Sequence, residues 1–354
     1  MKYRLGEICD VVSGGTPSRA TAEFWDGGTI PWIKIGNIQR KYVDEADEYI
    51  TQAGLEGSSA KMLSAGTILF TIFATLGEVG ILTIEACTNQ AIAGITIKNQ
   101  SDILTDYLYY FLKSQKSCIA ALGRGVAQNN INLSILRNFE VPIPDLPMQK
   151  QIVAILDKTA KVVEVRQQQL QQLDELVKAR FVELFGDGNH PHIALIDLII
   201  EGAGLSYGIV QPGDDGTGDM GVLRPVDMVD GKISTASIKY IDRSIGDGFK
   251  KTELYGDELL ITVRGTTGIT ALTDIRFNGM NVTRGIAVVR YDRNKINPVY
   301  LNAYLNTDES QRYIQEHTRG ATLQQINLSD LRVQQIMVPP LALQEQMAAF
   351  IEQT

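Results

Sequence analysis

The sequence predicts an α+β protein in which two similar globular domains are joined by one long coiled-coil-type helix, as a pseudo-two-fold repeat. Residues 124–159 return without a gap as residues 319–354. Each copy of this segment follows a region of short apolar runs divided by glycines and polar turns. Between the two regions lies a long stretch without glycine or proline. A repeat of this length indicates two copies of one structural unit, each with its own core.

The first domain is expected to span residues 1–147. Apolar runs at 67–73, 80–84 and 91–97 alternate with turn residues and are therefore predicted strands. A helix is expected to follow, with Ser101 as its N-cap and a one-sided apolar face behind it.

Residues 148–187 are predicted to form a long spacer helix, with Met148–Phe185 helical and the glycines after it as the stop signal. At 1.5 Å per residue such a helix is about 57 Å long. One apolar residue recurs at every seventh position, which is typical of a coiled-coil seam. The predicted helix–helix interface consists of Leu156, Val163, Leu170, Val177 and Leu184. The alternative is a core helix that packs on one of the domains.

The second domain is expected to span residues 188–341 and to repeat the plan of the first. Asn297-Pro298 predicts the start of its helix, with an asparagine N-cap and a proline in the first turn. Its predicted strands are 258–263, 268–272 and 285–290.

Composition and charge restrict the function. Apolar residues make up 44% and charged residues 21% of the chain, which is typical of a globular protein. The net charge is −8 and neither domain is basic overall, so any affinity for DNA must come from local patches or from partner subunits. No apolar stretch is long enough to span a membrane, and the N-terminus lacks the apolar core of a signal peptide. Cys9, Cys87 and Cys118 include no close pair, which favours a reduced, cytoplasmic, metal-free protein.

Several short motifs accompany the repeat and the long helix. They are Ser13–Arg19, Ile30–Ile38, Gly66–Phe70 and Thr88–Ala91 in the first domain, and Tyr207–Gly213 and Asn281–Gly285 in the second. With these motifs, the order of domain, long helix, domain and helix resembles the specificity subunit of type I DNA restriction-modification enzymes over essentially the whole chain.

This resemblance implies that the two domains are target-recognition domains, each reading one half of a bipartite site in double-stranded DNA. It also implies that the long helices pair antiparallel, set the spacing and dock methyltransferase (modification) subunits, beside a restriction/translocase subunit. Residues 342–354 begin a second spacer helix, and the counterpart of residues 160–185 is absent after Thr354. We therefore expect a truncated second helix and a homodimer in which Met148–Phe185 pairs with its copy in another molecule.

The chain is expected to be non-catalytic, without cofactor or metal. Asn297-Pro298-Val299-Tyr300 is similar to the Asn-Pro-Pro-aromatic tetrapeptide of adenine methyltransferases but lacks the second proline, and helix capping explains it. There is no GxxxxGK[ST] loop for a nucleotide. His190-Pro191-His192 follows a helix end, where a solvated linker explains it better than a metal site.

The candidate DNA-binding residues are donors and acceptors on loops beside the predicted strands, where they could reach phosphates and base edges. In the first domain they are Gly14, Gly15, Thr16, Arg19, Lys34, Asn37, Asn89, Gln90 and Arg124. In the second they are Tyr207, Arg224, Asp227, Arg264, Asn281, Thr283, Arg284 and Arg319. Surface turns, strand-edge solvation and hairpin geometry remain the structural alternatives for these residues.

Position within the repeat separates two kinds of candidate. Arg124 and Arg319 lie in the repeated segment, which suggests shared architecture or phosphate contact rather than sequence choice. Lys34 and Arg224 occupy matching places in the two domains. A second function also remains open: a non-catalytic coiled-coil protein-interaction adaptor that has lost DNA reading, suggested by the acidic balance and the truncation.

Overall fold

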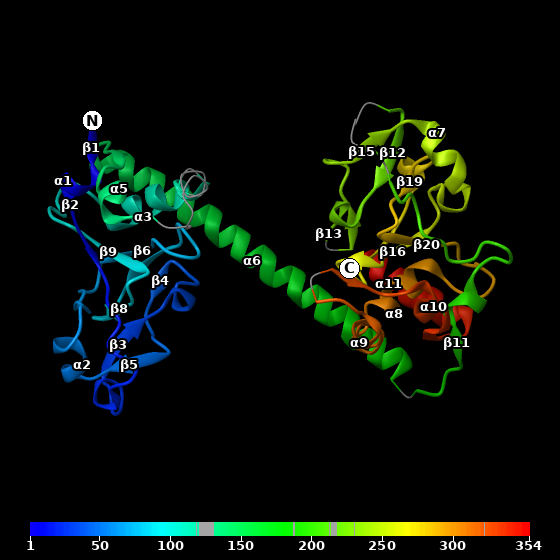
Figure 1. The fold of residues 1–354 in the computed structure, drawn as a ribbon, viewed down its shortest axis with the longest axis horizontal. Coiled ribbons are helices and arrows are strands. Elements are labelled where there is room, and N and C mark those ends of the chain that lie inside the picture. Colours follow the sequence, from blue (N-terminus) through cyan, green and yellow to red (C-terminus); the bar gives the residue numbers. More distant parts are fainter. Residues whose placement is uncertain are drawn as a thin grey trace. The chain divides into compact units, whose positions relative to one another are not determined.

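The chain folds into two compact units, Met1–Arg166 (unit 1) and Gln167–Thr354 (unit 2), which are described separately below (Figure 1). The structure is a computed structural model, and α6 (Leu146–Phe185) contributes to both units. It describes residues 1–117, 119, 131–186, 188–211, 213, 218–229, 231–321 and 323–354.

Unit 1 is built on two sheets. The larger has the order β2 (Cys9–Ser13), β9 (Ile92–Ile97), β6 (Ile68–Thr71), β7 (Val79–Leu82) and β4 (Tyr42–Val43). The smaller has the order β5 (Glu48–Ile50), β3 (Ile30–Ile33) and β8 (Cys87–Thr88). The three strands predicted from apolar runs are confirmed as β6, β7 and β9, each somewhat shorter than its run.

Short helices and one strand pair close unit 1. The helices are α1 (Leu5–Ile8), α2 (Gln52–Glu56), α3 (Thr105–Ser114) and α5 (Leu133–Arg137). The first strand, β1 (Lys2–Arg4), pairs antiparallel with the last strand of the unit, β10 (Glu140–Pro142). The predicted cap of α3 is wrong: the N-cap is Leu104, and the Ser101 hydroxyl bonds Asn99 instead.

Unit 2 repeats this plan with more and shorter strands. One sheet has the order β15 (Lys239–Ile241), β12 (Met220–Leu223) and β19 (Asn281–Val282), and another β18 (Thr270–Leu272), β16 (Leu259–Thr262) and β20 (Ile286–Val289). Two-stranded pairs are β13 (Met228–Val229) with β14 (Lys232–Ile233), β17 (Arg264–Gly265) with β21 (Gln324–Gln325), and β11 (His192–Ala194) with β22 (Gln335–Met337). The pair β11–β22 closes unit 2 as β1–β10 closes unit 1.

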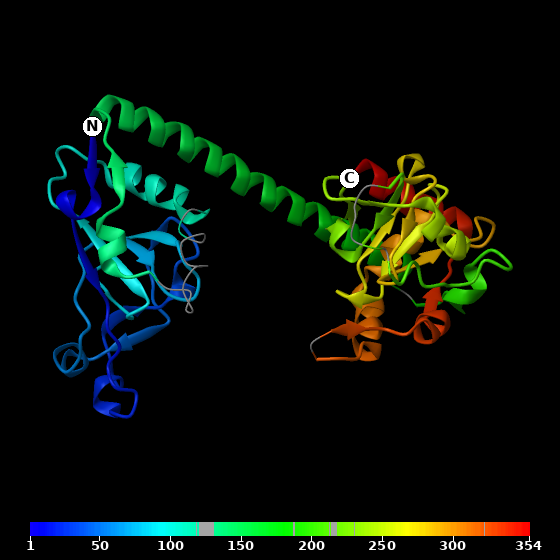
Figure 2. The ribbon, with the colours of Figure 1, turned by 45° about the horizontal axis from the view of Figure 1, so that its top comes forward.

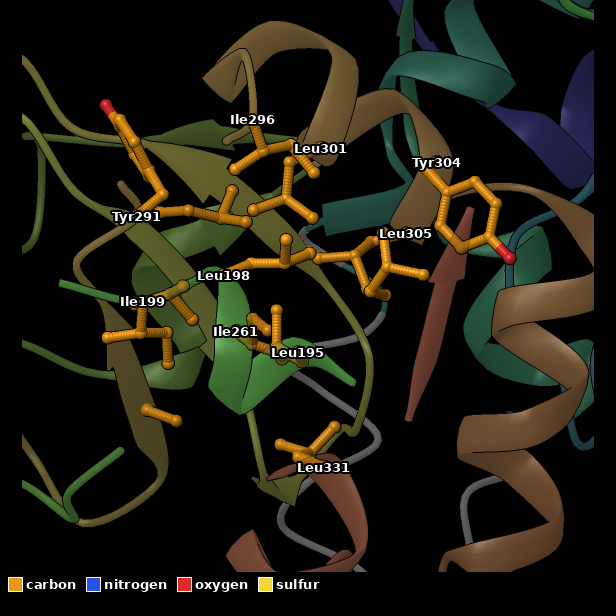
Figure 3. Close-up of a cluster of buried hydrophobic side chains, with 14 of the residues drawn as sticks. Leu195, Leu198, Ile199, Ile261, Tyr291, Ile296, Leu301, Tyr304, Leu305 and Leu331 are labelled. Atoms are coloured by element: carbon orange, nitrogen blue, oxygen red, sulfur yellow. The ribbon is translucent and has the colours of Figure 1, made fainter. Parts of the chain in front are cut away.

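Helices cover the core of unit 2. They are α7 (Arg243–Gly246), α8 (Pro298–Leu305), α9 (Asp308–His317), α10 (Leu328–Val333) and α11 (Leu341–Gln353). Asn297 caps α8 as predicted, because its side-chain oxygen accepts the N–H groups of Val299 and Tyr300. Figure 3 shows part of the buried cluster that contains Leu301 and Leu305 of α8 together with Leu195, Leu198 and Ile261.

The predicted long helix is confirmed as α6, which Figure 2 shows as one unbroken helix. Every residue from 157 to 172 is exposed, on all faces of the helix. Towards its C-terminus, α6 packs the partly buried Val177, Phe181 and Leu184 against the core of unit 2. Among the described residues, no helix is long and apolar enough to cross a lipid bilayer.

A buried glutamine joins the start of each long helix to its own unit in the same way. The Gln149 side chain accepts the Leu104 N–H at 2.9 Å and donates to the carbonyl oxygens of Asp102 and Pro144, each at 2.9 Å. In unit 2, Gln344 accepts the Asn297 N–H at 2.8 Å and donates to two corresponding carbonyls. Both glutamines are completely buried, so the sequence repeat reflects a repeated structural joint.

Candidate nucleic-acid interface

The candidate residues of the two units sit on one common backbone frame. The N–H of Gly15 donates to the Thr88 carbonyl at 2.9 Å, as the N–H of Ile209 donates to Val282 at 2.8 Å. In unit 1, Gly14 lies so close to the facing strand that a Cβ on this residue would lie 2.2 Å from the Thr88 hydroxyl oxygen. Gly14 and Gly15 therefore permit close packing of the loop.

Two matched turns hold the cationic candidates in place. In unit 1 the Lys34 N–H donates to the Asn37 side chain at 2.8 Å, and in unit 2 the Arg224 N–H donates to Asp227 at 2.8 Å. Asp227 is completely buried and also accepts the Arg224 guanidinium and the Ser237 hydroxyl. The Asp227 hydrogen bond raises the pKa of Arg224. Asp227 and Asn37 thus act as turn caps that position the neighbouring cation.

Arg19 lies in a polar and aromatic cluster in unit 1. Its guanidinium carbon stands 3.7 Å from the Trp25 ring centroid, and it forms an ion pair with Glu48 at 2.5 Å. Lys34 reaches the same carboxylate at 2.6 Å. The Lys34 hydrogen bond lowers the pKa of Glu48 against the effect of burial, and Arg19 lowers it further. Lys34 also comes within 3.9 Å of Asp47, so the two cations of this cluster are held beside two carboxylates.

Amide and hydroxyl groups complete the unit 1 surface. Gln90 is exposed and its side-chain oxygen accepts the Thr16 hydroxyl. Asn89 is half-buried, and its side-chain oxygen accepts the Ala91 N–H at 3.1 Å. Gln90 therefore keeps its NH₂ group for a ligand, whereas Asn89 supports the loop.

Unit 2 brings three arginines together on adjoining segments. Strand β17 places Arg264 opposite Gln325. The backbone N–H and carbonyl groups of Gln325 also form two hydrogen bonds of 2.8 Å with those of Arg319. The Arg264 carbonyl lies 3.4 Å from the Cβ position of Gly285, the residue after Arg284. Within the described part of the chain, Arg264 and Arg284 form no ion pair, and Arg319 comes only within 4.0 Å of Asp330. This arginine rim (Arg264, Arg284 and Arg319) suits phosphates or guanine edges.

The remaining unit 2 candidates differ in exposure. Tyr207 is 40% exposed, and its hydroxyl accepts the Leu328 N–H at 3.4 Å. Thr283 is half-buried beside Arg284. Asn281 is buried, and its side-chain oxygen accepts the Thr252 hydroxyl at 2.8 Å, so it holds the frame and does not reach the surface.

Arg124 lies outside the described residues.

The predicted helix–helix residues fall into two groups. Val163 and Leu170 are exposed, at 51% and 62%, whereas Val177 and Leu184 pack on the core of unit 2. Leu156 is half-buried. The uncovered part of the stripe is thus confined to the middle of α6.

One exposed turn escaped the sequence analysis. Phe73 is 45% exposed just after β6, and Ala74 has a positive φ of 57°. Such a left-handed backbone costs an alanine about 1–2 kcal/mol. The turn corresponds to Arg264-Gly265 of unit 2, where Gly265 has φ 90°. Threonine and glycine shared between 71–77 and 262–268 were the available signal.

No metal site is found in the described ranges: no group of three or more His, Cys, Asp or Glu side chains there is placed to hold an ion. His190, one of the two linker histidines, stacks edge-on against Phe185.

The sequence was compared with known families and proteins. The profile of the family "Type I restriction modification DNA specificity domain" matches residues 1–175 and 219–354. The specificity subunit of the type I restriction enzymes EcoR124I and EcoR124II from Escherichia coli is 33% identical over 44% of this chain and 39% of its own length. That of EcoBI, also from E. coli, is 22% identical over 76% of this chain and 62% of its own. The chain thus spans less than two thirds of these relatives.

The fold was compared with solved structures. The S subunit of a type I restriction-modification system from M. genitalium aligns over 100% of this chain and 88% of its own, with a TM-score of 0.54 and 15% identity. This similarity is one of fold.

Proposed function

Because this chain belongs to the family of type I restriction modification DNA specificity domains, we propose that it is a sequence-specific DNA-recognition subunit of a type I restriction-modification complex. Units 1 and 2 each read one half of a bipartite site. The observation that carries this proposal is the common frame of the two units with different exposed residues at matched places. Gln90 in unit 1 corresponds to Arg284 in unit 2, as the equivalent hydrogen bonds around them indicate.

The charge distribution supports local DNA contact despite the overall charge of −8. The arginine rim of unit 2 and the Arg19–Lys34 cluster of unit 1 supply cations where the loops are exposed. Arginine can bond a guanine bidentately and the amide of Gln90 an adenine. Contacts with phosphates make such binding sensitive to salt.

Methyl transfer and cleavage are assigned to partner subunits, a methyltransferase (modification) subunit and a restriction/translocase subunit. The two copies share an exposed glutamine, Gln151 in one and Gln346 in the other, whose side chain has no structural task among the described contacts. Identical exposed residues at the two helix starts suit docking of two identical modification subunits. We also propose a homodimer through the uncovered residues of α6.

The test is binding by the full chain together with its modification subunit. A methylation map of a genome that carries this gene supplies the two half-sites. Arg284→Ala should then weaken binding by about 1–3 kcal/mol through base pairs of one half-site only. The matched control is Arg276→Ala, which removes an exposed arginine paired with Asp274. Equal loss at both half-sites would contradict the division of labour, and no sequence preference at all would favour the protein-interaction adaptor.

A further inference from the structure

We propose that Phe73 in unit 1 and Arg264 in unit 2 are equivalent specificity-determining residues that contact base edges in their own half-sites. Phe73 contacts the methyl group of a thymine, and Arg264 contacts the O6 and N7 acceptors of a guanine. This inference rests on the proposed DNA-recognition function and assigns residues within it.

The two residues occupy the same place in the same turn. The turn after β6 is closed by the Gly77 N–H, which donates to the Thr71 carbonyl at 3.0 Å. The turn after β16 is closed by the Gly268 N–H, which donates to the Thr262 carbonyl at 2.9 Å. In both turns the N–H after the glycine donates to the threonine hydroxyl, at 2.8 Å and 2.9 Å. Phe73 and Arg264 each stand two residues after the threonine.

The backbone that follows each residue is also the same. Ala74 has φ 57° and Gly265 has φ 90°, so both turns reverse through the left-handed region. Glycine enters this region freely, whereas alanine is unfavourable there. Unit 1 therefore keeps the backbone conformation that orients Phe73, although it has Ala74 where unit 2 has Gly265.

Both turns adjoin the loops that carry the other candidates. The N–H of Ile72 donates to the Ala91 carbonyl at 2.8 Å, directly after Gln90. The N–H of Val263 donates to the Gly285 carbonyl at 2.8 Å, directly after Arg284. The turn that carries Phe73 thus lies beside the loop that carries Gln90, and the turn that carries Arg264 lies beside the loop that carries Arg284.

The chemistry of Phe73 decides between phosphate and base contact. A neutral phenyl ring gains nothing from a phosphate, yet this ring is 45% exposed on a polar surface. The major groove offers one apolar group, the methyl group of thymine. A shared backbone with a phenylalanine in one copy and an arginine in the other fits two domains that read different bases.

The experiment uses the full chain bound to its modification subunit and a library in which each base pair of the mapped site is randomised. Phe73→Ala should lower the preference for one thymine in one half-site by about fourfold, which is the effect of burying one methyl group. Replacing that thymine by uracil, which lacks the methyl group, should cost the unchanged protein the same factor and Phe73→Ala nothing further. Arg264→Ala should weaken the preference for one guanine in the other half-site.

Two further variants make the result decisive. Phe73→Arg copies the residue of unit 2 and should change the preferred base at the same position, which a general loss of folding would not do. The control Ile135→Ala truncates a residue 39% exposed on α5, which packs against α1, and should leave the preference unchanged.

Three outcomes would overturn the assignment: an unchanged profile for Phe73→Ala, an equal loss for every sequence, or relaxation by Phe73→Ala and Arg264→Ala in the same half-site. A complex that shows no sequence preference before any substitution would overturn the proposed function itself. The two failures are therefore distinguishable.

Discussion

At the scale of single residues, the matched caps Asn37 and Asp227 differ in charge and in burial. Asp227→Ala removes four hydrogen bonds to a buried carboxylate, three of them from Arg224, which is itself part-exposed. We expect a loss of about 2–3 kcal/mol in the free energy of unfolding. Asn37→Ala removes a neutral cap and should cost about 1 kcal/mol. Thermal unfolding followed by circular dichroism measures both losses. Equal losses would contradict the larger contribution expected from the charged, buried Asp227.

Two buried thiols give a prediction in the alkaline range. Burial raises the pKa of Cys9 to about 12 and that of Cys87 to about 11, above the ordinary value of 9.0. Folding thus favours the neutral thiols, and the stability that they contribute is present below pH 9 and lost as pH rises towards 11–12. In a Cys118→Ser background, a thiol reagent at pH 8 should label neither cysteine until urea is added. Rapid labelling of the native chain would contradict this.

At the scale of elements, the buried glutamine fixes the start of each long helix to its own unit. Gln149→Ala should destabilise unit 1 by roughly 2–4 kcal/mol, because three backbone groups lose the buried side chain that they bond. Gln344→Ala should do the same in unit 2. The matched control is Gln151→Ala, at a position equally repeated but exposed, which should change stability by less than about 0.5 kcal/mol. Denaturant unfolding compares the three, and a similar loss for Gln151→Ala would argue against the joint.

The uncovered middle of α6 gives a prediction about assembly. Val163 and Leu170 are exposed, and such apolar side chains gain by burial against a second helix. The isolated chain should therefore be a dimer at micromolar concentration by light scattering, and Leu170→Glu should shift it towards the monomer. Gln168→Glu adds the same charge on the opposite face of the helix and is the control. A wild-type monomer would rule out this interface.

Sequence patterns predicted the elements better than the site. The repeat, the strands and α6 follow from periodicity, because burial on one face leaves a regular apolar pattern. The burial of Asp227 and Asn281 could not be predicted, because it depends on partners such as Ser237 and Thr252 that distant segments supply. The position of Phe73 was hard to predict for another reason: an alanine does not indicate a left-handed backbone, and only the threonine and glycine shared with residues 262–268 point to the turn.

At the scale of the whole molecule, the proposed function divides DNA reading and chemistry between subunits. We expect the purified chain alone to transfer no methyl group to unmethylated DNA from a labelled donor and to cut no DNA. Addition of the modification subunit should restore methyl transfer at the mapped site. Methyl transfer by the chain alone would contradict the proposed function.

The pairing of β1 with β10 also affects the order in which the protein forms during synthesis. The β1–β10 pair of unit 1 cannot form until Pro142 has been synthesised, because β1 pairs with the last strand of the unit. All of α6 and all of unit 2 are translated after that point, which takes roughly ten to forty seconds at the usual rate. A domain of this kind folds in milliseconds to seconds. Unit 1 should therefore be complete before the strands of unit 2 can compete for its edges, which protects two similar halves of one chain from pairing with each other.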